Sequence, residues 1–227
     1  MNKKLFAFSF LIFFLVACTD KNFDSTKYAN DSERFKAEYE FYNKKKDEHG
    51  VNARVLSINA ENPIVYASIQ DIIRKIDDNQ SFIVYFGYPL CPWCRANVES
   101  MILAACDNKI EQIYYVDVSD VRDTYILKRG NKLVKEKSAD NDYYQLLNRL
   151  QNVLDDYILQ DADGNNINVN EKRIYAPNVI MVRDGNAMSI AADSEKITDP
   201  YMVLNHEALN DLYEIYNNMF KEFMLSN

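Results

Sequence analysis

The chain has 227 residues, of which 48% are hydrophobic and 13% aromatic, and its formal net charge at pH 7 is −8. This length is enough for one domain with a full core and some elaborations. The acidic balance argues against nucleic acid as a partner and against electrostatic adhesion to anionic lipid.

The N-terminus has the features of an export signal. Basic residues precede an apolar run at 5–17, which is too short to span a bilayer comfortably. Leu15-Val16-Ala17-Cys18 resembles the lipobox of bacterial lipoprotein precursors. The resemblance implies that 1–17 is a signal peptide and that Cys18 carries acyl chains such as palmitate, which anchor the protein to the extracytoplasmic face of the cell membrane. An ordinary signal peptide or an uncleaved anchor stays open, and either also places the domain where dithiols can be oxidised.

The segment before the main domain divides into two parts. Residues 18–30 are polar without apolar periodicity, and we interpret them as a tether. Asp31-Ser32-Glu33 offers a helix start. The following residues place Phe35, Tyr39 and Tyr42 on one face. Residues 31–50 are therefore predicted to be a helical extension that docks through its aromatic face on a domain at 51–227.

From residue 53 the pattern alternates between strands and helices. Strands are predicted at 54–58, 82–86 and 112–118, with one helix capped by Ser68 and another after the cysteines. The continuous apolar run at 82–86 is expected at the centre of a sheet covered on both faces. The order βαβαβ predicts an α/β fold with mostly parallel strands.

Cys91-Pro92-Trp93-Cys94 lies between the strand at 82–86 and a predicted helix. A helix N-terminus carries free N–H groups and partial positive charge, which stabilise a thiolate. Pro92 suits the first helical turn. Cys94 shares the apolar stripe of this helix and should point inward as the resolving thiol, whereas Cys91 should lie at the surface as the attacking nucleophile.

Other interpretations of the cysteines stay open. The pair could form a purely structural disulfide or part of a metal site, although Cys106, His49 and His206 have no useful ligand spacing to it. No metal and no cofactor is predicted. Cys106 lies on the apolar stripe and is expected to be a small buried hydrophobe, with a regulatory thiol as the alternative.

The stretch 119–173 is less regular. Residues 121–140 are charged and predicted to be rich in loops, and residues 143–157 have helical spacing. Asp161-Ala162-Asp163-Gly164-Asn165 is predicted to be a hairpin turn, because its glycine comes too early for a calcium loop. Strands at 179–182 and 187–190, a turn at Asp184-Gly185, and a helix carrying Leu209 to Phe223 complete the chain.

Two motifs together resemble the thioredoxin superfamily: the run from Phe86 to Cys94, and Tyr175-Ala176-Pro177-Asn178-Val179. The resemblance covers roughly residues 53–225. It implies a central mixed sheet flanked by helices, with 119–173 as an insertion before the cis-proline strand. It also implies a cis bond before Pro177, where such bonds occur, and an extended substrate that pairs with the backbone of Ala176.

The chain departs from this family in two ways. Pro92-Trp93 between the cysteines is closest to glutaredoxins, which are cytoplasmic. Tyr85 occupies the place where thioredoxins have a buried acid, so proton transfer at Cys94 must use another group or water. The chain therefore looks like a thioredoxin-like lipoprotein of bacteria.

The resulting hypothesis is a membrane-anchored thiol-disulfide oxidoreductase that acts on protein disulfides. Cys91 and Cys94 would be catalytic, and Pro92, Trp93, Ala176 and Pro177 would contact the substrate. A membrane electron donor or acceptor would recycle the pair. Because no histidine lies between the cysteines, a reductant or isomerase role is favoured over a strong oxidant. The alternatives are a redox-inactive binding lipoprotein on the same scaffold and a metal-binding module.

Overall fold

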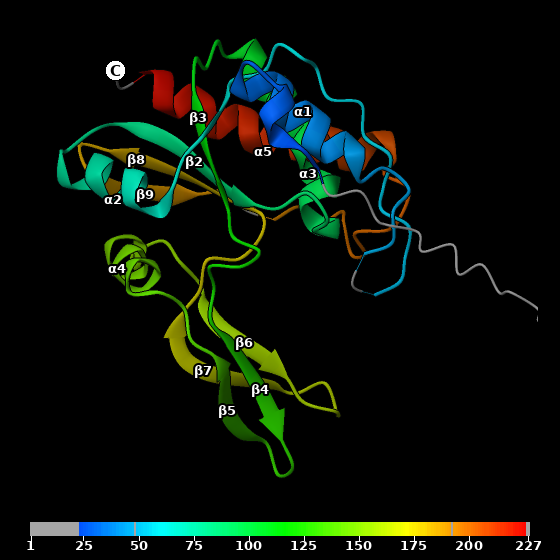
Figure 1. Cartoon of the computed structure of the whole chain (residues 1–227), viewed down its shortest axis with the longest axis vertical. Helices are drawn as coiled ribbons and strands as arrows, with labels where there is room; N and C mark the ends of the chain where they lie inside the picture. The colour runs from blue at the N-terminus through cyan, green and yellow to red at the C-terminus, as the bar shows by residue number, and fades with distance from the viewer. Residues whose placement is uncertain (1–22, 48, 192, 226–227) are drawn as a thin grey trace, which may run out of the picture.

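Figure 1 draws the computed structural model of the chain, which describes residues 23–47, 49–191 and 193–225. The predicted signal peptide and Cys18 lie outside these residues. Five strands form the central sheet in the order β1-β3-β2-β8-β9. Their bounds are β1 (Ile64–Tyr66), β2 (Phe82–Gly87), β3 (Ile113–Asp117), β8 (Asn178–Arg183) and β9 (Asn186–Ile190). β1, β3 and β2 are parallel, whereas β8 is antiparallel to β2 and to β9, so the sheet is mixed.

β2 is the central strand, and all its residues are buried. Successive side chains of a strand point to opposite faces. Ile83 and Tyr85 accordingly enter the core on one side of the sheet, and Val84 and Phe86 enter the core on the other. The prediction of a strand covered on both faces is confirmed.

Helices cover both faces of the sheet (Figure 1). α1 (Asp31–Phe41), α3 (Pro92–Asp107) and α5 (His206–Leu225) contribute to the core on one face, and α2 (Ile69–Asp77) and α4 (Asn141–Leu150) to the core on the other. Ser68 caps α2 with a reciprocal capping box to Asp71. No helix within the described ranges is long and apolar enough to cross a membrane.

The N-terminal extension is part of the core. Phe35 and Tyr39 of α1 are completely buried, and the Phe35 ring lies edge-on to the Tyr115 ring with centroids 5.0 Å apart. Burying two aromatic side chains contributes several kcal/mol, on the order of 2–3 each. The predicted docking face is confirmed for Phe35 and Tyr39, whereas Tyr42, the third residue predicted on this face, is the C-cap of α1 and only half-buried. The described end of the predicted tether also packs, because the Phe23 ring centroid lies 5.7 Å from that of Phe41.

The prediction of a strand at 54–58 is wrong. The segment is extended, but its backbone bonds to side chains instead of a sheet: Asn43 bonds both backbone groups of Leu56, and Glu40 accepts the N–H of Ile58. Leu56 and Ile58 are buried, which explains the alternating pattern. The first strand of the βαβαβ order is β1 instead.

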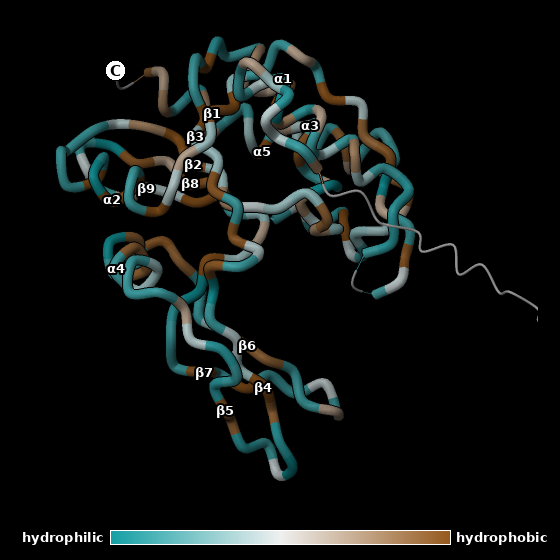
Figure 2. The backbone as a smooth tube through the Cα atoms, in the orientation of Figure 1, coloured by the Kyte–Doolittle hydropathy of each residue, from teal (hydrophilic) through white to brown (hydrophobic). Residues whose placement is uncertain are grey.

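Two hairpins project from the body of the domain (Figure 1). They are formed by β4 (Thr124–Lys128) with β5 (Lys132–Lys137), and by β6 (Asp156–Gln160) with β7 (Asn166–Lys172). Residues 121–140 are therefore not loop-rich as predicted, and the predicted helix ends at Leu150, with Tyr157 on β6. The turn predicted at Asp161 is confirmed. Both tips are mostly hydrophilic (Figure 2), and the strands of the first hairpin are half-buried to exposed, so apolar periodicity is weak in this part of the sequence.

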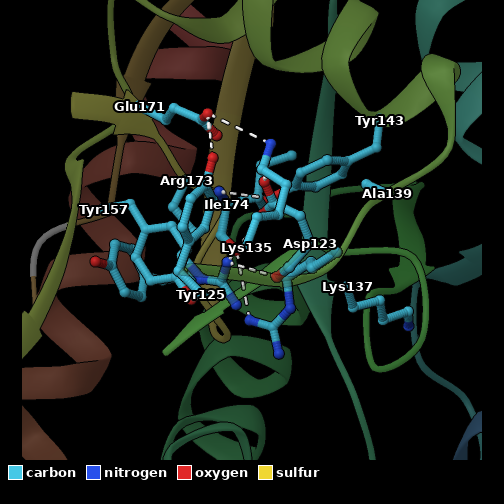
Figure 3. A network of polar contacts seen from close by, with 12 residues as sticks. Asp123, Tyr125, Lys135, Lys137, Ala139, Tyr143, Tyr157, Glu171, Arg173 and Ile174 are labelled. Atoms are coloured by element: carbon cyan, nitrogen blue, oxygen red, sulfur yellow. Dashed lines mark hydrogen bonds and ion pairs between the residues drawn. The ribbon is translucent and has the colours of Figure 1, made fainter. Parts of the chain in front are cut away.

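A polar network joins the two hairpins (Figure 3). Asp123 is 2% exposed and accepts from Arg173 Nη1 at 3.3 Å, and its Oδ2 lies 3.6 Å from Lys135 Nζ. Lys135 also lies 3.4 Å from Glu171 Oε1 on β7. These pairs connect Asp123, before the first hairpin, and Lys135, on β5, to Glu171, on β7, and Arg173, just after it. The two hairpins therefore lie side by side.

Candidate functional site

The dithiol lies where α3 begins, as the sequence predicts. Cys91 is the N-cap of the helix, and its sulfur accepts the backbone N–H of Cys94 at 3.2 Å. Pro92 occupies the first turn, where the absent N–H would have had no helical partner. Both cysteines are free thiols in this structure. The sulfur of Cys91 therefore lies against the free N–H groups of the helix, where a thiolate is favoured.

The loop before β8 reaches the same point from a distant part of the chain. The Ala176–Pro177 peptide bond is cis, as predicted. The Cys91 thiol donates a hydrogen bond to the carbonyl oxygen of Ala176 at 3.2 Å. Asn178 accepts the N–H of Tyr175 at 2.7 Å and so fixes the loop. The structure thus brings together the residues that the two sequence motifs singled out.

The two cysteines differ less in exposure than predicted. Cys94 is completely buried, as expected, but Cys91 is only 3% exposed, so the prediction that it lies at the surface is wrong. Its sulfur lies under the carbonyl of Ala176 and against the first turn of α3. Trp93, at 37% exposed, is the residue of the motif that presents a large apolar side chain to solvent.

The electrostatics separate the roles of the two thiols. The hydrogen bond from the Cys94 thiol lowers the pKa of Cys91, whereas burial raises it. The N–H groups of Cys94 and Trp93 and the positive charge of Arg122 lower it further. Burial raises the pKa of Cys94 well above its ordinary value. Cys91 therefore ionises first, which suits it to be the nucleophile and Cys94 to resolve.

Arg122 is a residue that the sequence analysis missed. It precedes β4, and its Nη1 donates to the carbonyl of Ile174 at 3.5 Å, while its guanidinium lies 5.6 Å from the centre of the Tyr88 ring. The inserted segment thus places a cation near Cys91. Charge alone gave no signal, because Arg122 is one of many charged residues in that stretch.

Two tyrosines lie behind Cys94. The Tyr85 hydroxyl lies 2.8 Å from the Tyr39 hydroxyl. Burial raises the pKa of Cys94, and hydrogen bonding by the Tyr85 hydroxyl opposes this effect. Burial raises the pKa of both phenols well above the ordinary value, so both are neutral at physiological pH. The sequence identified the position of Tyr85 but not its pairing with Tyr39.

Arg95, the residue after Cys94, is 1% exposed. Its Nη1 donates to the carbonyls of Tyr39 and Pro89, both at 2.8 Å, and its Nε donates to the carbonyl of Arg54 at 2.9 Å. Burial lowers its pKa to about 10. A single guanidinium therefore ties together α1, the loop before Cys91 and the extended segment at 53–58. Helical periodicity gave no indication of this role.

The third cysteine of the described residues is not buried. Cys106 is exposed, so the expectation of a small buried hydrophobe is wrong. It lies about a third of a turn around the helix from Cys94, which turns it away from the buried stripe. Across the described ranges no group of three or more His, Cys, Asp or Glu side chains is placed to hold a metal ion.

Comparison of the chain with models of known protein families gives no match, and a search among curated proteins finds no relative. The class of protein is therefore described from its own fold and site. It is a mixed α/β domain in which two free cysteines begin a helix beside a cis-proline loop.

Proposed function

We propose that this protein is a thiol-disulfide oxidoreductase of thioredoxin-like fold that acts on protein disulfides. The observation that carries the proposal is the position of the Cys91 sulfur, which caps α3 and lies 3.2 Å from the carbonyl oxygen of Ala176, next to the cis-proline. A low-pKa thiol, a buried second thiol and an adjacent loop backbone are the parts that disulfide exchange requires.

In the reducing direction, the Cys91 thiolate attacks one sulfur of a substrate disulfide. The substrate S–S bond breaks, its other sulfur leaves as a thiolate and takes up a proton, and a mixed disulfide forms at Cys91. Cys94 then loses its proton and attacks the Cys91 sulfur, and the second substrate sulfur leaves. The substrate gains two electrons and two protons, and Cys91 and Cys94 become a disulfide.

The substrate would bind as an extended segment along the loop before β8. In this proposal Ala176 offers backbone hydrogen bonds, and Pro177 fixes the direction of the loop. In the same proposal, Pro92 and Trp93 form the apolar edge of the binding site across from this loop. Because Cys91 is nearly covered, the substrate displaces the hydrogen bond between its thiol and Ala176 as it binds.

The site of action follows from the N-terminal sequence. With Cys18 acylated, the domain would be anchored at the membrane on the extracytoplasmic face, where a membrane electron donor or acceptor can recycle the pair. A reductant or isomerase is the favoured role, because Pro92-Trp93 supplies no imidazolium to stabilise the thiolate.

The reduction potential of the pair tests the proposal. The purified protein, carrying Cys106→Ala so that two thiols titrate in the domain, is equilibrated with glutathione buffers and the thiols are trapped by alkylation. A reversible transition near or below about −230 mV is expected of a reductant, and one near about −120 mV would indicate an oxidant. Absence of a reversible transition would overturn the proposal and favour a redox-inactive binding protein.

A further inference from the structure

A chain of buried hydroxyl groups ends at the resolving cysteine. Tyr85 on β2 is 1% exposed, Cys94 on α3 and Tyr39 on α1 are fully buried, and all three belong to one core. Burial and the Cys91 thiol raise the pKa of Cys94, whereas hydrogen bonding by the Tyr85 hydroxyl and by the backbone of Tyr88 lowers it. None of these groups is a carboxylate, although a thiol must ionise here.

The place of the Tyr85 hydroxyl depends on Gly87. Residues two apart on a strand share a face. A Cβ on residue 87 would overlap the Tyr85 hydroxyl oxygen and would lie 2.5 Å from the ring carbon that carries it. Glycine at this position therefore leaves the space into which the phenol extends toward α3. The Tyr39 hydroxyl, 2.8 Å away, holds it from the other side.

We infer that Tyr85 is a catalytic hydrogen-bond donor to Cys94 and that Tyr39 is the residue that positions it. The Tyr85 hydroxyl donates to the Cys94 thiolate as this thiolate forms and attacks the mixed disulfide. This role rests on the proposed exchange reaction. It adds the group that stabilises the Cys94 thiolate in the second step, the attack on the mixed disulfide.

The chemistry of a buried phenol fixes the direction of this hydrogen bond. Tyr85 stays neutral, so it is a donor to an anion and not a base that could accept the proton of Cys94. That proton passes to the substrate sulfur, which leaves Cys91 as a thiol while the bond between Cys91 and Cys94 forms. A hydrogen bond to a charged sulfur in a fully buried site is worth more than one between neutral groups. Tyr39 strengthens it by donating to Tyr85 in turn.

The N-terminal extension thereby completes the site. Tyr39 belongs to α1, and its carbonyl oxygen is held by Arg95, the residue that follows Cys94. Tyr39 is thus held at two points: its carbonyl is bound by Arg95 of α3, and its hydroxyl is bonded to Tyr85 of β2. A domain lacking α1 would keep Tyr85 but not the group that orients its hydroxyl.

Stopped-flow reaction with dithiobis(nitrobenzoate) separates the two steps. In the reduced, full-length protein carrying Cys18→Ala and Cys106→Ala, attack by Cys91 releases one thionitrobenzoate and resolution by Cys94 releases the second. We expect Tyr85→Phe to leave the first release unchanged and to slow the second at least about tenfold, because a hydrogen bond to the reacting anion is lost. Tyr39→Phe should slow the second release by a smaller factor.

Tyr216→Phe is the matched control. Tyr216 is a buried phenol of the same core, but its hydroxyl donates to Asn97 at 3.0 Å. Both releases should keep their rates in this variant.

A second release at the unmutated rate in Tyr85→Phe would overturn the inference, while the exchange reaction would stand. No release from Cys91 in the unmutated protein would overturn the exchange reaction and the role of Tyr85 with it. If Tyr85→Phe does not fold, an unchanged second release in Tyr39→Phe overturns the inference instead.

Discussion

The Nη1 atom of Arg95 lies 2.8 Å from the carbonyl oxygen of Tyr39, although the two residues belong to different helices, α3 and α1. The same nitrogen lies 2.8 Å from the carbonyl oxygen of Pro89, just before Cys91. Backbone carbonyls, together with the side-chain oxygen of Asn43, are therefore the partners of a buried guanidinium at the start of α3. This arrangement couples the stability of the domain to the geometry of the dithiol.

Replacing Arg95 by methionine should destabilise the protein strongly. The substitution keeps much of the side-chain volume but leaves the carbonyls of Tyr39, Pro89 and Arg54 without their donor. We expect the free energy of unfolding in urea to fall by about 3 kcal/mol or more. Arg74→Met is the control, because Arg74 pairs with Asp71 on the exposed side of α2, where loss of a pair costs at most about 0.5 kcal/mol. Equal losses in the two variants would contradict the assigned role of Arg95.

Gly87→Ala should disturb the site through Tyr85. The new Cβ would overlap the phenol of Tyr85, which is buried in the core. Overpacking of this kind costs about 1–3 kcal/mol, measurable as a lower urea midpoint. Combining Gly87→Ala with Tyr85→Leu removes the overlapping ring. If the alanine costs as much in the Tyr85→Leu background as it does beside the native tyrosine, the contact with the phenol is not the cause.

The alkylation of the reduced protein should depend on pH differently at each cysteine. Because the hydrogen bond from the Cys94 thiol lowers the pKa of Cys91, its reaction with iodoacetamide should have a midpoint below the ordinary thiol value of 9.0. Burial raises the pKa of Cys106, so its midpoint should lie above 9.0. Mass spectrometry of the two peptides measures both in one sample.

Cys94→Ala provides the check on the cause. It removes the strongest contribution to the lowered pKa of Cys91, so the midpoint for Cys91 should rise while that of Cys106 stays in place. A midpoint for Cys91 at or above that of Cys106 in the unmutated protein would be inconsistent with Cys91 as the nucleophile.

Asp123→Ala should weaken the junction of the two hairpins. The substitution removes the shared partner of Arg173 and Lys135. The free energy of unfolding should fall by roughly 2 kcal/mol, less than for a fully buried pair, because the Lys135 side chain is 32% exposed. Asp156→Ala, which breaks an exposed pair with Lys172, should change the stability much less. The opposite ranking in urea titrations would show that the network contributes little.

The sequence by itself determined the local features of this protein. The spacing of apolar residues placed β2 and α3, and a dithiol between them is necessarily at a helix N-terminus. These features depend on neighbouring residues, whose geometry is set by the period of a helix or a strand. The expectation of a cis bond at Pro177, which the structure contains, and of an acid at the position of Tyr85 came from the resemblance to a known family and not from the local pattern.

Only the tertiary structure decided which distant groups meet at the site. Alternation at 54–58 marked buried residues correctly. The backbone of this segment is bonded by side chains of α1, of the residue Asn43 and of α3, and not by a neighbouring strand. The burial of Cys91 depends on the loop at Ala176, and the hydroxyl chain depends on α1 docking beside β2. Periodicity reports which face of an element is buried. It does not report which element covers that face, because this choice is made by the packing of the whole chain.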